Sequence, residues 1–196
     1  MDVRRIARHP VTWGAAVVLA LALAGALYLF QPWRLFTTVH VAEPVPTAAA
    51  VAPSADGDPS ADGDPSAEGD ASAPAAEPAG PEVIATGRFI SHEHATSGTA
   101  KVLKLADGRR VLRIENLDTS DGPDLRVWLS DQPVKEGTAG WRLFDDGAWV
   151  ELGDLKGNKG DANYAIPADA DLGELTSVTI WCRRFAVSFG AAALKA

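Results

Sequence analysis

Hydrophobic and polar positions divide the 196-residue chain into three zones before any motif is considered. A run without charge extends from Val11 to Phe30. A polar zone rich in Ala, Pro, Ser, Asp and Gly then continues to residue 82, and residues 83–196 carry short segments that alternate between apolar and polar positions. In order, these patterns predict a helix, a disordered linker and a set of β-strands.

The charge-free run predicts one transmembrane helix over residues 11–30. Twenty helical residues, each rising about 1.5 Å, cross roughly 30 Å, which is the thickness of a bilayer's hydrocarbon core. Arg4, Arg5 and Arg8 precede the run, so residues 1–10 are expected to stay cytoplasmic as a short tail. A cleaved signal peptide is the alternative, although its apolar core usually spans only about 7–15 residues. We expect an uncleaved, single-pass anchor in the cell membrane and an extracytoplasmic C-terminal domain.

Residues 31–82 form the expected linker. Residues 43–82 contain nine carboxylates and no Lys or Arg, and residues 53–70 repeat PSADGD, PSADGD and PSAEGD. The segment has too few apolar side chains to offset the conformational entropy that the chain would lose on folding. It is therefore predicted to be disordered. Its expected role is to hold the outer domain clear of the membrane. No basic patch occurs anywhere in the chain that would indicate a nucleic-acid partner.

The pattern of residues 83–196 predicts an all-β domain, an antiparallel sandwich or barrel. Asp107-Gly108 is a strong hairpin signal between two strand-like runs. Leu125, Val127 and Leu129 alternate with Arg126 and Trp128, so one face is expected to point to a core and the other to solvent. The expected strands are Thr86–Ile90, Thr99–Leu105, Arg110–Leu117, Leu125–Ser130, Trp149–Leu152, Asn163–Ile166, Leu175–Cys182 and Phe185–Phe189.

Cys182 is the only cysteine of the chain, so an exported domain cannot close a disulfide within itself. It ends an apolar strand, and the alternation breaks directly after it, at Arg183-Arg184. A bulge or tight turn there would bring the apolar residues on both sides of the break to the core. Its thiol is then inert core packing, an intermolecular link or a reactive group. The neighbouring arginines would lower its pKa only if their charges approach the sulfur.

Several kinds of chemistry are excluded by the residue inventory. The chain has no Cys-x-x-Cys pair and no Cys-x-x-Cys-His motif, which excludes a dithiol centre, an iron–sulfur cluster held by one chain, and covalent c-type haem. It also lacks the Gly-x-Ser-x-Gly elbow of serine hydrolases.

His92 and His94 could present two imidazoles on one side of a strand, because their spacing is i, i+2. With Cys182 they would make a His₂Cys set of the kind that holds copper or zinc. The surrounding segment Ser91–Gly98 reads as a polar loop, so an exposed, non-ligating role is favoured and no metal site is predicted. Four tryptophans are interpreted as packing residues, with a ligand-stacking surface as the alternative: Trp128, Trp141, Trp149 and Trp181.

Seven short segments occur in order along the outer domain: Gly87–Phe89, His94–Gly98, Val111–Asn116, Gly122–Leu125, Leu152–Asn158, Tyr164–Pro167 and Ile180–Phe185. Together they resemble the electron-transfer DM-thirteen domain family. That family includes Skeletor-type animal proteins, where the domain accompanies DOMON domains, and bacterial envelope proteins whose membrane anchors are similar to this one. The resemblance implies an all-β fold and electron transfer at the cell surface, with Cys182 as a free redox thiol or as a ligand to a group such as haem. It implies that His94 is the histidine that accompanies this cysteine.

The expected function is therefore electron transfer by a membrane-anchored, extracytoplasmic domain through Cys182, with His94 as a second ligand or proton partner. If haem or a metal binds, these two residues are the expected ligands, although no motif names a cofactor. The expected partners are the membrane and an unidentified redox or surface partner. The alternative is a non-catalytic surface-binding module in which Cys182 only packs the core.

Overall fold

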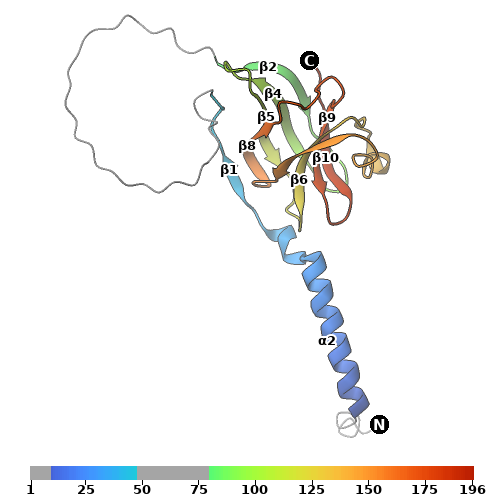
Figure 1. Ribbon diagram of the computed structural model, residues 1–196. Coiled ribbons are helices and arrows are strands. Elements are labelled where there is room, and N and C mark those ends of the chain that lie inside the picture. Colours follow the sequence, from blue (N-terminus) through green and yellow to red (C-terminus); the bar gives the residue numbers. More distant parts are fainter. Residues whose placement is uncertain (1–9, 48–79) are drawn as a thin grey trace, which may run out of the picture.

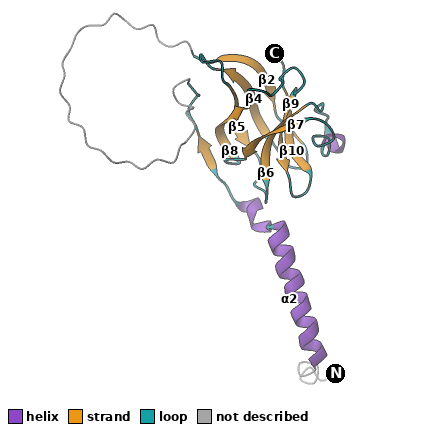
Figure 2. Ribbon diagram, in the orientation of Figure 1, coloured by secondary structure: helices purple, strands orange, loops and turns teal. Residues whose placement is uncertain are grey.

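The computed structural model describes residues 10–47 and 80–196 (Figure 1). Almost all of the expected cytoplasmic tail, and residues 48–79 of the expected linker, lie outside the described residues. The apolar run forms helix α2 (Pro10–Phe30), and a short 3₁₀-helix, η1 (Pro32–Phe36), follows it (Figure 2). Within the described ranges, one helix, with its span at Trp13–Phe30, is long and apolar enough to cross a membrane, a property that a signal sequence shares.

The rest of the described chain forms two five-stranded sheets, which confirms the predicted all-β sandwich. The first sheet has the order β1 (His40–Ala42), β8 (Lys159–Ile166), β5 (Arg110–Asp118), β4 (Ser97–Lys104) and β2 (Glu82–Arg88). The second has the order β3 (Ile90–Ser91), β10 (Val187–Ala193), β9 (Ser177–Cys182), β6 (Leu125–Ser130) and β7 (Trp149–Asp154). All pairings are antiparallel except that of β1 with β8.

The core lies between the two sheets and follows the alternation read from the sequence. Leu125, Val127 and Leu129 are buried in it, as predicted. The predicted hairpin at Asp107-Gly108 joins β4 to β5, and Gly108 has the positive φ, +84°, that such a turn requires. A turn after Cys182 leads into β10 and brings Val187 and Phe189 into the same core, as the break in alternation suggested.

The outer face of the second sheet differs from the sequence prediction. Trp128 was expected to face solvent, yet only 3% of its surface is exposed. The segment between β6 and β7, which contains η2 (Gly137–Gly140), accounts for this difference: its Phe144 is fully buried against Trp128 and Trp181 in a second, smaller apolar cluster. β9 is consequently buried along its whole length, because each of its faces has a cover.

The first strand, β1, lies within the expected linker, but the structure places it at the edge of the first sheet. It runs parallel to β8, with Val41 opposite Gly160. A Cβ atom on Gly160 would overlap the carbonyl oxygen of Val41, so a residue without a side chain permits this approach. The nearly buried Arg113 donates hydrogen bonds to the carbonyl oxygens of Glu43 and Pro44, at 3.1 and 3.2 Å.

This pairing places three residues of the expected linker, residues 40–42, in the sheet. Residues 43–81 connect β1 to β2, and both strands belong to the same sheet. The end of α2 therefore lies next to the β domain. Figure 1 shows α2 projecting from the domain, with its N-terminal end far from the strands.

Candidate functional site

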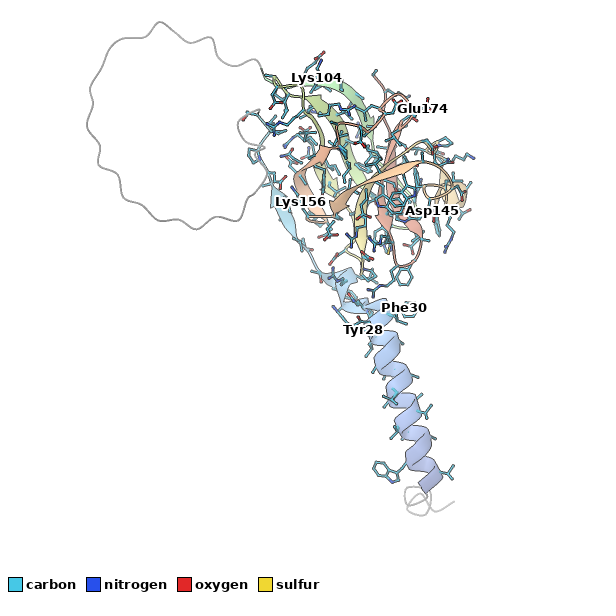
Figure 3. The ribbon with its side chains drawn as sticks, in the orientation of Figure 1. Tyr28, Phe30, Lys104, Asp145, Lys156 and Glu174 are labelled. Carbon is cyan, nitrogen blue, oxygen red and sulfur yellow. The ribbon has the colours of Figure 1, made fainter. Side chains whose placement is uncertain are left out.

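The end of helix α2 packs against the turn between β9 and β10. Arg184 Nη1 donates hydrogen bonds to the carbonyl oxygens of Tyr28 and Leu29, at 3.2 and 3.0 Å. These are among the last carbonyls of the helix, where a cation is favoured by the helix dipole. The ring of Phe185 stacks on that of Phe30 with centroids 5.6 Å apart. Figure 3 shows Tyr28 and Phe30 at this junction.

A second contact joins the segment after the helix to the same end of the domain. Arg34 Nη1 donates a 3.2 Å hydrogen bond to the carbonyl oxygen of Gly122 and lies 3.5 Å from Asp121 Oδ1. Between the two contacts the helix end and the domain enclose a cleft of about 520 Å³. Its lining residues come from both parts of the chain: Phe30, Gln31, Pro32, Arg34, Leu35, Glu93, His94, Asp121, Gly122, Pro123, Trp141, Arg142, Phe185, Val187 and Phe189.

His94 forms part of the cleft wall. Its ring lies on that of Phe189, with centroids 3.9 Å apart, and its Nε2 atom is 2.6 Å from a carboxylate oxygen of Glu93. About a fifth of its side chain, 22%, is exposed. The imidazole is thus fixed in place by a ring and a carboxylate while remaining open to the cleft.

His92 does not lie in an exposed loop, contrary to the sequence interpretation. It is buried beneath the segment that covers the outer face of the second sheet. Its Nε2 lies 3.0 Å from the carbonyl oxygen of Lys135, and its Nδ1 lies 2.7 Å from the Ser188 hydroxyl oxygen. Since a carbonyl can only accept, Nε2 carries the proton in this arrangement. Burial lowers the pKa of His92. The hydrogen bond to the Lys135 carbonyl raises it by a smaller amount, so the pKa lies below its ordinary value.

Cys182 is the last residue of β9, and none of its surface is exposed. It belongs to the apolar core between the sheets, opposite Leu125 of β6 and Val187 of β10. Burial raises the pKa of the Cys182 thiol above its ordinary value of 9.0, and hydrogen bonding with nearby backbone groups opposes this shift less strongly. The thiol is therefore protonated near neutral pH.

The two arginines after Cys182 do not activate it. Arg183 lies 3.8 Å from Asp124 Oδ2 and 3.6 Å from Glu151 Oε2, so its charge is directed toward those two carboxylates. Arg184 is directed to the end of α2. The structure thus does not place the thiol in the electropositive, partly exposed setting that lowers a cysteine pKa.

The sequence of residues 88–194, more than half of the chain, matches the profile of the electron transfer DM13 family. The chain belongs to this family. No curated protein and no solved structure matches it significantly.

The DM13 match contains His94, Cys182 and the β-strand part of the cleft, but it excludes α2, η1 and β1. The cleft therefore combines the family domain with a part of the chain that precedes it. Sequence reasoning missed this site because its other wall is the end of the apolar helix. Phe30 at that end and Arg184 and Phe185 in the turn make the contact. Nothing in the sequence pairs these residues, because they are about 155 positions apart.

A haem or metal held by Cys182 does not fit this structure of the DM13 domain. The thiol lies in the core and is not among the cleft-lining residues, whereas His94 is. Within the described ranges, no three His, Cys, Asp or Glu side chains are grouped closely enough to hold a metal ion. The two residues that the sequence suggested as joint ligands thus differ in their surroundings, because the Cys182 thiol lies in the core and the His94 imidazole lies in the cleft wall.

Cys182 nevertheless lies close to the cleft. It sits directly opposite Val187 in the β9–β10 ladder, and Val187 lines the cleft wall. Directly opposite residues in antiparallel strands point to the same face with Cβ atoms about 4.5–5.5 Å apart. The thiol therefore lies one cross-strand spacing from an aliphatic side chain that lines the cleft.

Proposed function

We propose that this chain is a membrane-anchored DM13 domain that passes electrons between a small, planar redox molecule of the quinone class and an acceptor outside the membrane. The observation that carries the proposal is the cleft, because it lies where the apolar helix meets the electron transfer domain. With α2 as the anchor and its preceding arginines cytoplasmic, the cleft lies at the outer surface of the cell membrane. A quinone dissolved in the bilayer would reach it without crossing water.

The cleft walls suit a flat ring. Phe30, Phe185, Phe189 and Trp141 supply aromatic surfaces, and aromatic rings favour offset or edge-to-face packing with one another. A volume of about 520 Å³ falls within the range of roughly 300–1,000 Å³ that is typical of small-molecule sites. The cleft is therefore large enough for a bicyclic quinone.

Polar groups in the cleft suit the carbonyl oxygens of a quinone. His94 and Arg142 both line the cleft and both can donate hydrogen bonds. Arg142 Nη1 already donates to the carbonyl oxygens of Phe185 and Ala186, at 3.2 and 3.3 Å, which holds it over the β9–β10 turn. A few polar groups placed in a mainly apolar pocket fix the orientation of a ligand.

Cys182 has a different role in this proposal from that of a nucleophile. A buried, protonated thiol is poorly suited to attack a disulfide or an electrophile, since the thiolate is the reactive form. Its location beside Val187, which lines the cleft, instead brings a polarisable sulfur to within one cross-strand spacing of the cleft wall. We propose that it lies on the route that electrons take from the bound ligand, with His94 holding the ligand.

The test uses the full chain in detergent micelles, titrated with menadione while tryptophan fluorescence is recorded. Menadione should bind and quench the signal, and His94→Ala should weaken binding about tenfold, which corresponds to the loss of about 1.4 kcal/mol from a stacking and hydrogen-bonding contact. Lys104→Ala is the matched control, because Lys104 is exposed and lies at the other end of the domain from Phe30 (Figure 3). Absence of binding, or equal affinity in both variants, would overturn the assignment.

A non-catalytic binding module is the second candidate, and the complete burial of Cys182 favours it. In that case the cleft or the nearby loops bind a partner, and the thiol only packs the core. Cys182→Ala distinguishes the two functions: electron transfer from reduced menadione to an external acceptor should slow if the sulfur lies on the route. An unchanged protein-dependent rate would favour the module without redox function.

A further inference from the structure

Three tryptophans form a continuous stack on the outer face of the second sheet. The rings of Trp149 and Trp128 are nearly parallel, with an interplanar angle of 5° and centroids 4.0 Å apart. Trp128 in turn stacks on Trp181, with centroids 5.2 Å apart and an angle of 27°. The three residues belong to neighbouring strands, β7, β6 and β9, so the sheet itself sets their spacing.

The stack leads from the interior to the surface. Trp181 and Trp128 are 1% and 3% exposed, whereas 43% of Trp149 is exposed. Along the axis of β6, Trp181 lies opposite Arg126, Trp128 follows two residues later, and Trp149 lies opposite Ser130. Two strand residues span about 6.6–6.8 Å, so each step moves the path further from the cleft.

The inner end of the stack adjoins the residues of the proposed route. Trp181 is bonded to Cys182, and the two side chains point to opposite faces of β9. Cys182 lies opposite Val187, which lines the cleft. The stack and the cleft are therefore connected through two adjacent residues of one strand.

The middle tryptophan has a proton acceptor. Trp128 Nε1 donates a 3.0 Å hydrogen bond to Glu151 Oε2. Glu151 Oε1 also accepts a 3.3 Å hydrogen bond from Arg126 Nη1, and Glu151 Oε2 lies 3.6 Å from Arg183 Nη1. The Trp128 indole is thus buried, stacks on a tryptophan ring on each side, and donates a hydrogen bond to the Glu151 carboxyl group.

We propose that Trp149, Trp128 and Trp181 form a path along which single electrons hop between the domain interior and a one-electron oxidant at the surface. Indole is among the most readily oxidised side chains, and rings in van der Waals contact couple their π-systems directly. The inner end of the path rests on the proposed function, since the reduced ligand of the cleft is the electron donor. The stack itself is independent of that ligand.

The electrons and protons balance at each step. The external oxidant takes one electron from Trp149 and is reduced. Trp128 then donates one electron to the oxidised Trp149 and releases its Nε1 proton to Glu151. This leaves a neutral Trp128 radical beside a carboxylic acid. An electron from Trp181 and the proton from Glu151 then restore Trp128. The reduced ligand of the cleft, a hydroquinone, returns one electron to Trp181 and releases one proton to the water at the mouth of the cleft.

The path is tested by laser flash oxidation of the full chain in micelles with photogenerated tris(bipyridine)ruthenium(III), recorded by transient absorption. Trp13 and Trp33 lie outside the stack and are exposed, so Trp13→Phe and Trp33→Phe are introduced first to remove competing donors. In this parent, oxidation should produce a long-lived neutral tryptophan radical. Trp128→Phe should abolish that signal and leave only a short-lived radical at the surface.

Two further variants keep the test decisive if Trp128→Phe does not fold. Trp149→Phe changes a partly exposed ring and should remove the surface entry to the path, with loss of the buried radical. Glu151→Gln keeps the shape but removes the base, so the radical should persist as the protonated cation. An identical radical yield and spectrum in the parent and these variants would overturn the path and leave the stack as packing.

Two measurements on the same protein separate this inference from the proposed function. They are the flash-induced radical, which requires no cleft ligand, and the binding of menadione. A radical that forms in a protein that binds no menadione would support the tryptophan path while rejecting the cleft ligand. Menadione binding without a stack-dependent radical would do the reverse.

Discussion

The two faces of strand β9 have different chemistry although their residues alternate along one short segment. On the inner face Val178, Ile180 and Cys182 are packed in the aliphatic core between the sheets. On the outer face Thr179 hydrogen-bonds the Ser188 hydroxyl oxygen at 2.8 Å, and Trp181 joins the aromatic stack. Both faces are buried, yet only the outer one is connected to the surface through groups that carry polar or redox chemistry.

The difference follows from what covers each face. A second sheet covers the inner face with interdigitating side chains, which leaves the thiol protonated and out of reach of solvent. A single irregular segment covers the outer face, and its backbone groups need partners, such as the Lys135 carbonyl that accepts from His92. If this strand has a redox role, electron transfer through its side chains is therefore favoured over a direct reaction at the buried sulfur.

The largest expected effect is the protection of Cys182 from thiol reagents. Because the sulfur is inaccessible, modification requires an opening of the domain, and an opening free energy of about 5 kcal/mol slows it by about a thousandfold or more. Stopped-flow labelling of the full chain, with and without denaturant, measures this ratio.

The matched control places a cysteine on the surface. Glu174 is exposed, so Glu174→Cys in a Cys182→Ala background should react at the rate of a free thiol. If Cys182 in the folded protein reacts nearly as fast as this control, the inner face is not the sealed layer described above.

The next largest effect concerns the cover of the outer face. Phe144 is fully buried and packs edge-on against Trp181 with centroids 6.3 Å apart. Phe144→Ala should lower the free energy of unfolding by about 3–5 kcal/mol, because it removes a buried ring and leaves a cavity. Denaturant titration monitored by tryptophan fluorescence measures the change.

Thr138→Ala is the control for that experiment, because Thr138 is an exposed residue of the same segment. It should change the free energy of unfolding by no more than about 0.5 kcal/mol. Equal losses in the two variants would mean that the segment does not act as a second core.

A smaller effect distinguishes polar from apolar surroundings at Cys182. Cys182→Ser buries a hydroxyl in the aliphatic core and should cost about 1–3 kcal/mol of unfolding free energy. Cys182→Ala, which buries no polar atom, should cost less. Thermal and denaturant unfolding of the two variants gives the order, and a serine variant at least as stable as the alanine variant would show that the inner face near the turn is polar.

The sequence was sufficient for the fold class and for one of these two faces. Period-two alternation identified Leu125, Val127 and Leu129 as core residues, because one side of a sheet must be apolar for the sandwich to form. The same pattern assigned Trp128 to solvent. Alternation distinguishes two faces, but it does not indicate that an irregular segment distant from the strand will cover the second one.

The candidate site was less predictable for a related reason. Cys182 and His94 were identified by residue type, but the cleft depends on two long-range contacts. Phe30 reaches Phe185 in the turn after β9, and Arg34 reaches Gly122, which is 88 residues away in the sequence. β1 has only three residues, too few for a reliable pattern, and it becomes a strand because the edge of β8 is available to it. Such contacts depend on tertiary topology, which local periodicity does not encode.

The smallest expected effect is a pH dependence that arises at the outer face. Burial lowers the pKa of His92 below its ordinary value of 6.5, so the unfolded chain binds a proton more readily than the folded one. Stability should therefore be fully present above about pH 6.5 and decline as the pH falls below it toward the lowered pKa. His92→Gln cannot titrate and should remove this component of the decline, as measured by unfolding at several pH values between neutrality and mild acid.

The carboxylates contribute their own acid dependence in both proteins, so the difference between the two curves is the quantity that matters. Parallel curves through this range would mean that His92 can be protonated in the folded state without cost, and that the outer face is more open to water than the inner one.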